Sequence, residues 1–142
     1  MTNNNASKGT IIIMRAASGS GKSTWIKTNF PEATVCSADN FFVSHGKGQY
    51  KFNPSLLGAA HKSCLSAFEK ALAAGDNVVV VDNTNIRKSW YQDYVKLATA
   101  KGYEVFQKCL TTKFQNTHGV PEEKVADMIK NFEEDLTLAH WE

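Results

Sequence analysis

The sequence lacks the features of membrane, secreted and metal-cluster proteins. In its 142 residues no apolar run approaches the roughly 20 residues that a membrane-spanning helix needs. Residues 1–8 are polar and contain no apolar segment of a signal peptide. The three cysteines are widely spaced and form no Cys-x-x-Cys pair, so neither a zinc site nor a disulfide framework is indicated. We therefore expect free, buried or partly buried thiols, no membrane association and a cytoplasmic location.

The sequence also lacks a strong charge of either sign. The formal net charge is +2, which is too weak to indicate nucleic-acid binding by itself, although it does not exclude a polyanionic substrate. Hydrophobic residues make up 42% and charged residues 21%, as in ordinary globular proteins. The length favours one domain. We expect a flexible tail over residues 1–9 and a single domain over 10–142.

The most informative stretch is residues 11–24, IIIMRAASGSGKST. An apolar run ends in a turn of glycine and serine, and Lys22 and Ser23 follow. Gly19 and Gly21 allow the backbone to curl until several N–H groups point at one place. A helix that begins here adds its unpaired N–H groups and the positive end of its dipole. The stretch therefore predicts a strand, a phosphate-binding loop and a helix.

Each position of this loop has a predicted role. Lys22 can reach the β- and γ-phosphates of ATP, and the Ser23 hydroxyl can bind Mg²⁺. The motif G-x-x-x-x-G-K-[ST] has Ala16 in place of its first glycine, which is tolerable with the negative φ expected at the end of a strand. A plain strand-to-helix connection is the alternative, but it does not require Lys-Ser-Thr at a helix start. The predicted phosphate-binding residues are Ser18, Gly19, Ser20, Gly21, Lys22, Ser23 and Thr24.

Hydrophobic periodicity predicts a strand followed by a helix, four times over. The predicted strands are 10–15, 33–37, 77–81 and 103–110, and the predicted helices are 22–29, 54–74, 87–101 and a last one from Pro121 to Leu136. This order indicates the α/β class: a three-layer fold with a mainly parallel four-stranded sheet and helices on both faces. On the second helix, we expect His61 to be a packed core histidine.

Two carboxylates follow predicted strands. Asp39 comes after strand 33–37, and Asp82 comes directly after the valines of strand 77–81. Ligands of open α/β sheets bind beyond the carboxyl ends of the strands, so both should lie beside the phosphate loop. Asp39 is then a candidate catalytic residue, and Asp82 a candidate Mg²⁺ ligand, directly or through water. The alternatives are a helix-capping carboxylate at Asp39 and a turn between Asp82 and Thr84.

Four blocks in this order resemble one known family. They are Ser18–Trp25, Asp39, Asp82–Asn85 and Asn116–Pro121. The combination resembles the P-loop NTPases of the kinase family that includes the 5′-kinase domain of bacteriophage polynucleotide kinase. It is also similar to the kinase-like domains of ubiquitin-ligase-binding proteins and of 2′,3′-cyclic-nucleotide phosphodiesterases of myelin. The resemblance extends from about Thr10 to Phe132.

The resemblance implies a role for each matched position. The backbone of 18–22 would hold the phosphates of ATP, and Asp39 would take the proton from the attacking hydroxyl. The loop 111–120 would be the lid over the nucleotide. The sequence departs from the family pattern at Phe42, where the polynucleotide kinase has an arginine, and in the lid, which contains no arginine. The candidate phosphate contacts that remain are Lys113, His118 and Arg87.

The leading hypothesis is an ATP- and Mg²⁺-dependent kinase, with Lys22 and Asp39 as catalytic residues. Its acceptor would be a hydroxyl, such as the 5′-end of a nucleic acid or a nucleotide. Two alternatives stay open. One is a nucleotide-binding module that captures a protein partner with little or no transfer, which the missing arginines favour. The other is a simple NTP hydrolase.

Overall fold

The computed structural model describes residues 8–16, 21–39, 54–110 and 135–141. Within them, one sheet has five strands in the order β2-β3-β1-β4-β5, and every pair of neighbours is parallel. The strands are β1 (Thr10–Ala16), β2 (Thr34–Cys36), β3 (Val78–Asp82), β4 (Glu104–Leu110) and β5 (Ala139–His140). The helices are α1 (Lys22–Asn29), α3 (Leu57–Ala74) and α4 (Gln92–Ala100), with 3-10 turns η2 (Pro54–Leu56) and η3 (Lys88–Trp90).

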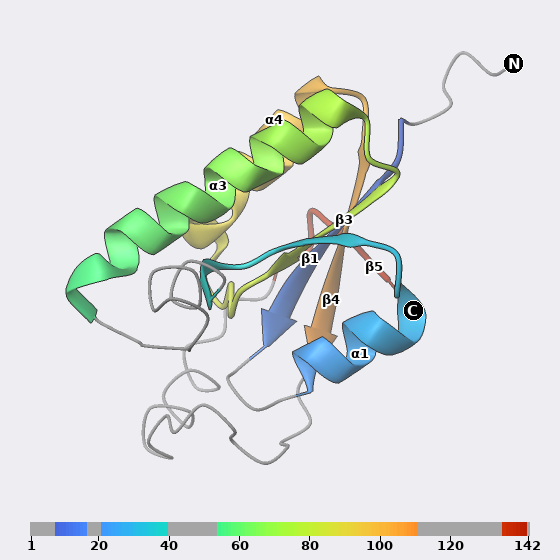
Figure 1. Cartoon of the computed structure of the whole chain (residues 1–142). Helices are drawn as coiled ribbons and strands as arrows, with labels where there is room; N and C mark the ends of the chain where they lie inside the picture. The colour runs from blue at the N-terminus through green and yellow to red at the C-terminus, as the bar shows by residue number, and fades with distance from the viewer. Residues whose placement is uncertain (1–7, 17–20, 40–53, 111–134, 142) are drawn as a thin grey trace, which may run out of the picture.

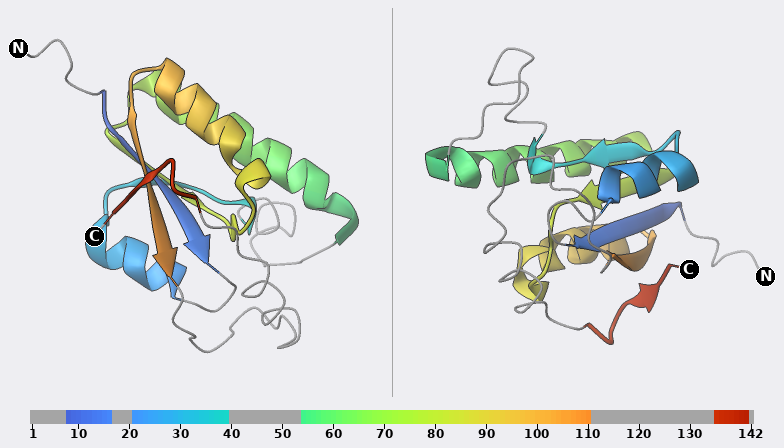
Figure 2. Two further views of the ribbon diagram at one scale, coloured as in Figure 1. Left: turned by 180° about the vertical axis from the view of Figure 1, so that it is seen from behind. Right: turned by 90° about the horizontal axis from the view of Figure 1, so that it is seen from below.

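Helices cover both faces of the sheet. Figures 1 and 2 show α3 and α4 side by side on one face and α1 on the other. The predicted α/β fold class with its parallel sheet is confirmed. The sheet has one strand more than expected, because β5 has only two residues and no apolar run marks it. Most of the predicted last helix lies outside the described residues; its expected end is wrong, since Leu136 lies in a bend and is 85% exposed.

The continuous apolar run of β1 follows from its place at the centre of the sheet. Its neighbours are β3 and β4, and helices cover both of its faces. Ile11 and Ile13 pack into the core beneath α3 and α4. Ile12 and Met14 point the other way, into the core beneath α1. A strand buried on both faces needs apolar side chains at every position, which explains the missing alternation.

The helix α3 buries one face and ends as predicted. Gly75 caps it in the left-handed conformation at φ 77, which glycine adopts without strain. Its buried residues are Ala60, Cys64, Phe68, Ala71 and Leu72. The expectation for His61 is wrong, because its side chain is exposed. The position after Ala60 lies just outside the buried stripe of the helix, so an apolar neighbour did not imply a buried histidine.

The cysteines are as predicted. Cys36 and Cys64 are buried and Cys109 is half-buried, and all three are free thiols. Burial raises the pKa of Cys36 to about 12 and also raises the pKa of Cys64. In the described ranges, no helix is both long and apolar enough to cross a membrane.

Candidate functional site

The candidate site lies at the carboxyl edge of the sheet. In the register of β1 and β3, Met14 pairs with Asp82, so the ends of these central strands lie next to each other. After β1 the chain passes through residues 17–20, outside the described ranges, and α1 begins at Lys22. Figure 1 shows the first turn of α1 beside the arrowheads of β1 and β4. The strand predicted before the loop and the helix predicted after it are therefore both present.

The first turn of α1 suits an anion. Gly21 precedes it with φ 92 and ψ 20, and the Trp25 N–H donates to the Gly21 carbonyl (2.9 Å). A left-handed conformation at this point favours glycine. The described first turn contains no acidic residue, and its N-cap Gly21 has no side chain that could cap it, so the dipole at this end of α1 favours an anion. Ala16 lies within β1 with ordinary strand conformation, so the loss of a glycine there causes no strain.

Lys22 interacts electrostatically with two carboxylates of the site. Burial lowers the pKa of its ammonium group, while the charges of Asp82 and Asp39 act in the opposite direction. Both carboxylates thus lie within electrostatic range of Lys22. Burial is the larger of these influences on the pKa. An anion bound beside Lys22 would favour the charged form of the ammonium group.

Asp39 follows β2 at the same edge. It lies with Ala38 in the first turn of a helical segment, its side chain is exposed, and its N–H donates to the Ser37 hydroxyl (3.1 Å). Asn83 holds this segment in place, since its side-chain oxygen accepts the Ala38 N–H (2.9 Å). The Asn83 amide also donates to the Cys64 sulfur on α3 (3.5 Å). One amide therefore fixes the end of β2, the end of β3 and α3 relative to one another.

The oxygen donors at this edge fit a magnesium ion. Asp82 is the half-buried last residue of β3, and Ser23 lies in the first turn of α1 beside Lys22. In the part of the chain that the structure describes, no three His, Cys, Asp or Glu side chains could hold a metal by themselves. Mg²⁺ commonly takes only one or two carboxylates and completes its shell with phosphates and water. Asp82 and Ser23 match that kind of donor set.

Some predicted site residues cannot be placed. Ser18, Gly19 and Ser20 of the phosphate loop, and Lys113 and His118 of the expected lid, lie outside the described residues. Among those that are described, Gly21, Lys22, Ser23 and Thr24 form the start of α1. Arg87 precedes η3 in an extended conformation with an exposed side chain. Its role as a phosphate contact stays a prediction.

Sequence analysis missed a buried arginine next to the phosphate loop. Arg15 has 0% exposed surface. Its Nε donates to the Asn85 carbonyl (2.8 Å), and its two terminal nitrogens donate to the Ile86 carbonyl (3.1 Å) and to the Gln107 side-chain oxygen (3.0 Å). Its guanidinium also lies over the Tyr91 ring, 4.8 Å from the centroid. The available signal was a cation within a strand predicted to be buried, which must have buried partners.

The network continues into the segment 135–141. The Gln107 amide donates to the carbonyls of Asp135 (2.6 Å) and Leu138 (2.9 Å), and the Tyr91 hydroxyl donates to the Asp135 carboxylate. Burial acts against the charged form of Asp135. Hydrogen bonds from Thr137 and Tyr91, together with the charge of Arg15, outweigh it and hold the pKa of Asp135 below its ordinary value. The buried arginine is thereby joined to a buried carboxylate.

Comparisons with known proteins agree with this geometry. A family model described as AAA domain matches residues 11–134. NEDD4-binding protein 2 of Homo sapiens is 30% identical over 139 residues, a match that covers 87% of this chain and 8% of that protein. The chain therefore spans less than a tenth of the length of this curated relative.

Solved structures share the fold. A chain of the Pnkp1/Rnl/Hen1 RNA repair complex is 18% identical with a TM-score of 0.67, covering 92% of this chain and 46% of that one. The Mycobacterium tuberculosis APS kinase CysC is 18% identical with a TM-score of 0.52, covering 91% and 100%. A second structure of that kinase, in complex with AMPPNP and APS, is 16% identical with the same TM-score and covers 86% and 69%. The chain belongs to the AAA domain family, and its fold is shared with solved kinases.

Proposed function

We propose that this domain binds ATP with Mg²⁺ and transfers the γ-phosphoryl group to a hydroxyl. The observation that carries the proposal is the position of Lys22. It lies at the uncapped start of α1 and within electrostatic range of two carboxylates that come from different strand ends. A phosphate grip alone needs no carboxylates. Phosphoryl transfer uses one to receive a proton and another to hold the metal.

Each residue then has a distinct task. The N–H groups at the start of α1 and the Lys22 ammonium bind the phosphates and offset their charge. Ser23 and Asp82 would hold Mg²⁺, which supplies further charge neutralisation at the phosphates when bound. Asp39, which is exposed at the edge of the site, accepts the proton of the acceptor hydroxyl. The acceptor oxygen forms a bond to the γ-phosphorus as the bond to the leaving ADP oxygen breaks.

The first acceptor to test is the 5′-hydroxyl of an oligonucleotide. The fold similarity to a chain of an RNA repair complex supports this choice, as does the resemblance of the motif blocks to polynucleotide kinases. The similarity to APS kinase supports a small nucleotide as the second acceptor to test. An oligonucleotide is larger than a single nucleotide, so it would cover more of the carboxyl edge of the sheet.

The decisive experiment uses γ-labelled ATP, Mg²⁺ and a 5′-hydroxyl oligonucleotide or APS. The unmodified protein should label an acceptor, and Asp39→Asn should lower the rate by about 100-fold or more with ATP affinity unchanged within about threefold. The matched control is Glu69→Gln, which also neutralises an exposed carboxylate but lies on α3; its rate should equal that of the parent. Transfer by Asp39→Asn at the parent rate would contradict the assignment of the base.

A second candidate is a nucleotide-binding module that captures a protein partner. The name of the human relative, a binding protein, favours it, and so do Phe42 and the absence of arginine from the expected lid. The same assay separates the candidates. Tight ATP binding with no label on any acceptor supports the module, whereas release of inorganic phosphate without an acceptor supports an NTP hydrolase.

A further inference from the structure

We propose that Arg15 is a positioning residue of the nucleotide site. Its buried guanidinium holds the loop after β3 (residues 83–86) against the end of β1, and so sets the position of Asp82 relative to Lys22 at the start of α1. The inference rests on the proposed function, because it assigns Asp82 to the metal. It is a different claim, however, since the nucleotide site could exist without this dependence on Arg15.

The end of β1 and the loop after β3 are joined by four hydrogen bonds. Two are the Arg15 bonds to the carbonyls of Asn85 and Ile86. In the third, the Ala16 N–H donates to the Thr84 carbonyl (2.9 Å), and in the fourth the Asn85 side chain donates to the Met14 carbonyl (2.8 Å). Asn85 in this loop has a φ of 48, a left-handed conformation that Asn adopts more readily than most residues other than glycine, and its side-chain bond to the Met14 carbonyl helps to hold it.

The guanidinium is suited to this task and not to catalysis. Arg15 is wholly buried, and its three donor nitrogens are directed at acceptors of the protein itself. It therefore acts on a ligand only through the backbone that it holds. The planar fork of arginine reaches several acceptors in fixed directions, whereas lysine offers one point of charge. Lysine at this position keeps the charge but cannot reproduce the fork.

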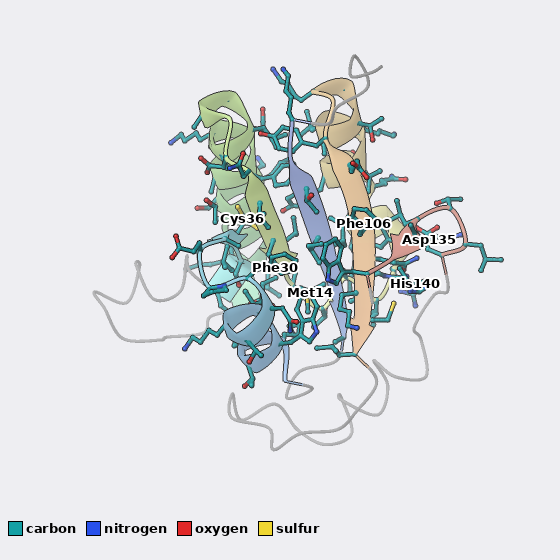
Figure 3. All side chains as sticks on the ribbon, turned by 90° about the vertical axis from the view of Figure 1, so that its right-hand side faces the viewer. Met14, Phe30, Cys36, Phe106, Asp135 and His140 are labelled. Carbon is teal, nitrogen blue, oxygen red and sulfur yellow. The ribbon has the colours of Figure 1, made fainter. Side chains whose placement is uncertain are left out.

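The opposite side of the guanidinium is anchored as well. Gln107 of β4 accepts from Arg15 and donates to the carbonyls of Asp135 and Leu138. Figure 3 shows Asp135 and Cys36 toward opposite sides of the sheet, with Met14 of the central strand between them. Arg15 thus links the central strand to the loop that follows Asp82 on one side and to the segment 135–138 on the other. A residue held from both sides can fix a loop more firmly than a single contact can.

The position of Asp82 matters for chemistry, since metal and phosphate sites tolerate only small displacements of their ligands. Asp82 directly precedes the loop that Arg15 holds. Lys22 lies on α1, and none of the four hydrogen bonds described above involves a residue of that helix. Loss of the Arg15 fork should therefore weaken the Mg²⁺-dependent part of nucleotide binding and spare the Mg²⁺-free part.

The first test examines the nucleotide-free protein by hydrogen exchange. In Arg15→Lys, the Ala16 amide should exchange about tenfold faster or more, while the amides of Ile11 and Ile12 stay within about threefold of the parent. The matched control is Ile13→Val, which changes an equally buried side chain on the same strand. It should leave the ratio of the Ala16 rate to the Ile11 rate unchanged. An unchanged ratio in Arg15→Lys would overturn the proposal.

The second test measures ATP binding at increasing Mg²⁺. The Mg²⁺ concentration at half-effect should rise about tenfold in Arg15→Lys, while ATP affinity in EDTA changes less than about threefold, because only the metal ligand is displaced. Asn85→Gly provides a second variant, since glycine accepts the positive φ and the bond to Met14 is lost. It should shift the midpoint in the same direction. If both variants, or the second alone where Arg15→Lys does not fold, keep the parent midpoint, the proposal is wrong.

The two proposals fail in different ways. If the unmodified protein binds no ATP at any Mg²⁺ concentration, the proposed function fails. If it binds ATP with Mg²⁺ and the variants match it in both tests, the ATP- and Mg²⁺-binding part of the proposed function stands and the role of Arg15 is refuted. If exchange at Ala16 accelerates but the Mg²⁺ midpoint does not move, Arg15 supports only the structure, and the positioning role is again refuted.

Discussion

The two ends of this sheet are built from different interactions. At the amino end, backbone hydrogen bonds, close packing and the hydroxyls of Thr34 and Tyr103 join the strands to the turns before them. At the carboxyl end, long polar side chains join the strands to the loops after them. Ligands of open parallel sheets bind at the carboxyl end, so the difference separates a part of the molecule that maintains the fold from a part that arranges chemistry.

The amino end leaves little space. The Thr10 N–H donates to the Asn77 carbonyl (2.8 Å), and the Tyr103 hydroxyl donates to the Asp76 carbonyl (3.0 Å). A Cβ at Gly9 would lie 2.4 Å from the Asn77 oxygen and 2.9 Å from the Tyr103 ring. These contacts are local and dense, and none of them involves a residue proposed to touch a ligand.

The carboxyl end depends on few residues, each of which joins several elements. Asn83 connects the ends of β2 and β3 with α3. Arg15 connects the end of β1 with the loop after β3 and with β4. A substitution at either should displace several elements, whereas a substitution at the amino end should act on stability alone.

The largest effect is expected for Lys22→Met. It should abolish ATP binding and transfer, since the phosphates lose their cation, with a loss of at least about 1,000-fold in rate. It should also raise the midpoint of thermal unfolding of the nucleotide-free protein, because burial already lowers the pKa of this ammonium and so opposes its charge. A lower midpoint of thermal unfolding together with retained ATP binding would contradict the role given to Lys22 at the carboxyl end. Lys27→Met, on the exposed side of the same helix, is the control.

Gly9→Ala should have the largest effect at the amino end. The added Cβ has no room beside the Asn77 backbone, so we expect a loss of about 2–3 kcal/mol in the free energy of unfolding, measured with urea. The folded fraction should bind ATP as the parent does. Gly58→Ala is the matched control, because nothing lies within 4 Å of a Cβ at that position in α3. It should be neutral or stabilising. A change of ATP affinity in Gly9→Ala would contradict the prediction that substitutions at the amino end act on stability alone.

Asp135→Asn should change how the free energy of unfolding depends on pH in the acid range. The folded pKa of Asp135 is lower than its unfolded value, so the charged carboxylate contributes stability above the ordinary pKa of about 3.9. That contribution is lost as the pH falls through the folded pKa. The variant should lose about 1–3 kcal/mol near neutral pH, and its stability should fall less steeply below about pH 4. Parallel curves of unfolding free energy against pH would contradict the prediction. Glu104→Gln changes an exposed carboxylate and is the control.

The smallest effects come from the same substitution at the two ends. Tyr103→Phe removes a hydrogen bond to a neutral carbonyl and should cost about 0.5–1.5 kcal/mol. Tyr91→Phe removes one to the Asp135 carboxylate and should cost about 1.5–3 kcal/mol. Both tyrosines are buried, so the losses in the free energy of unfolding, measured with urea, can be compared directly. Equal losses would mean that charge at the carboxyl end adds nothing to stability.

The sequence predicted what depends on local pattern. The valines of β3, the apolar run of β1 and the glycine at position 21 each indicate an element by neighbouring residues alone. The Arg15 network could not be predicted, because its partners lie 70 to 92 residues away and include a backbone carbonyl that any residue could supply. The two-residue β5 was not predicted for a similar reason, because its pairing with β4 defines it and its composition does not. The roles of Asp39, Asp82 and Lys22 remain predictions.

The central place of β1 has a consequence for how the chain is made. Among the described strands β1 comes first in the sequence, and the strands that pair with it begin only at Val78 and Glu104. The sheet therefore cannot close until most of the chain has left the ribosome, and contacts so distant in sequence make folding slow. Until then, the apolar run of β1 lacks the strands that pair with both of its edges, and exposed segments of this kind favour aggregation.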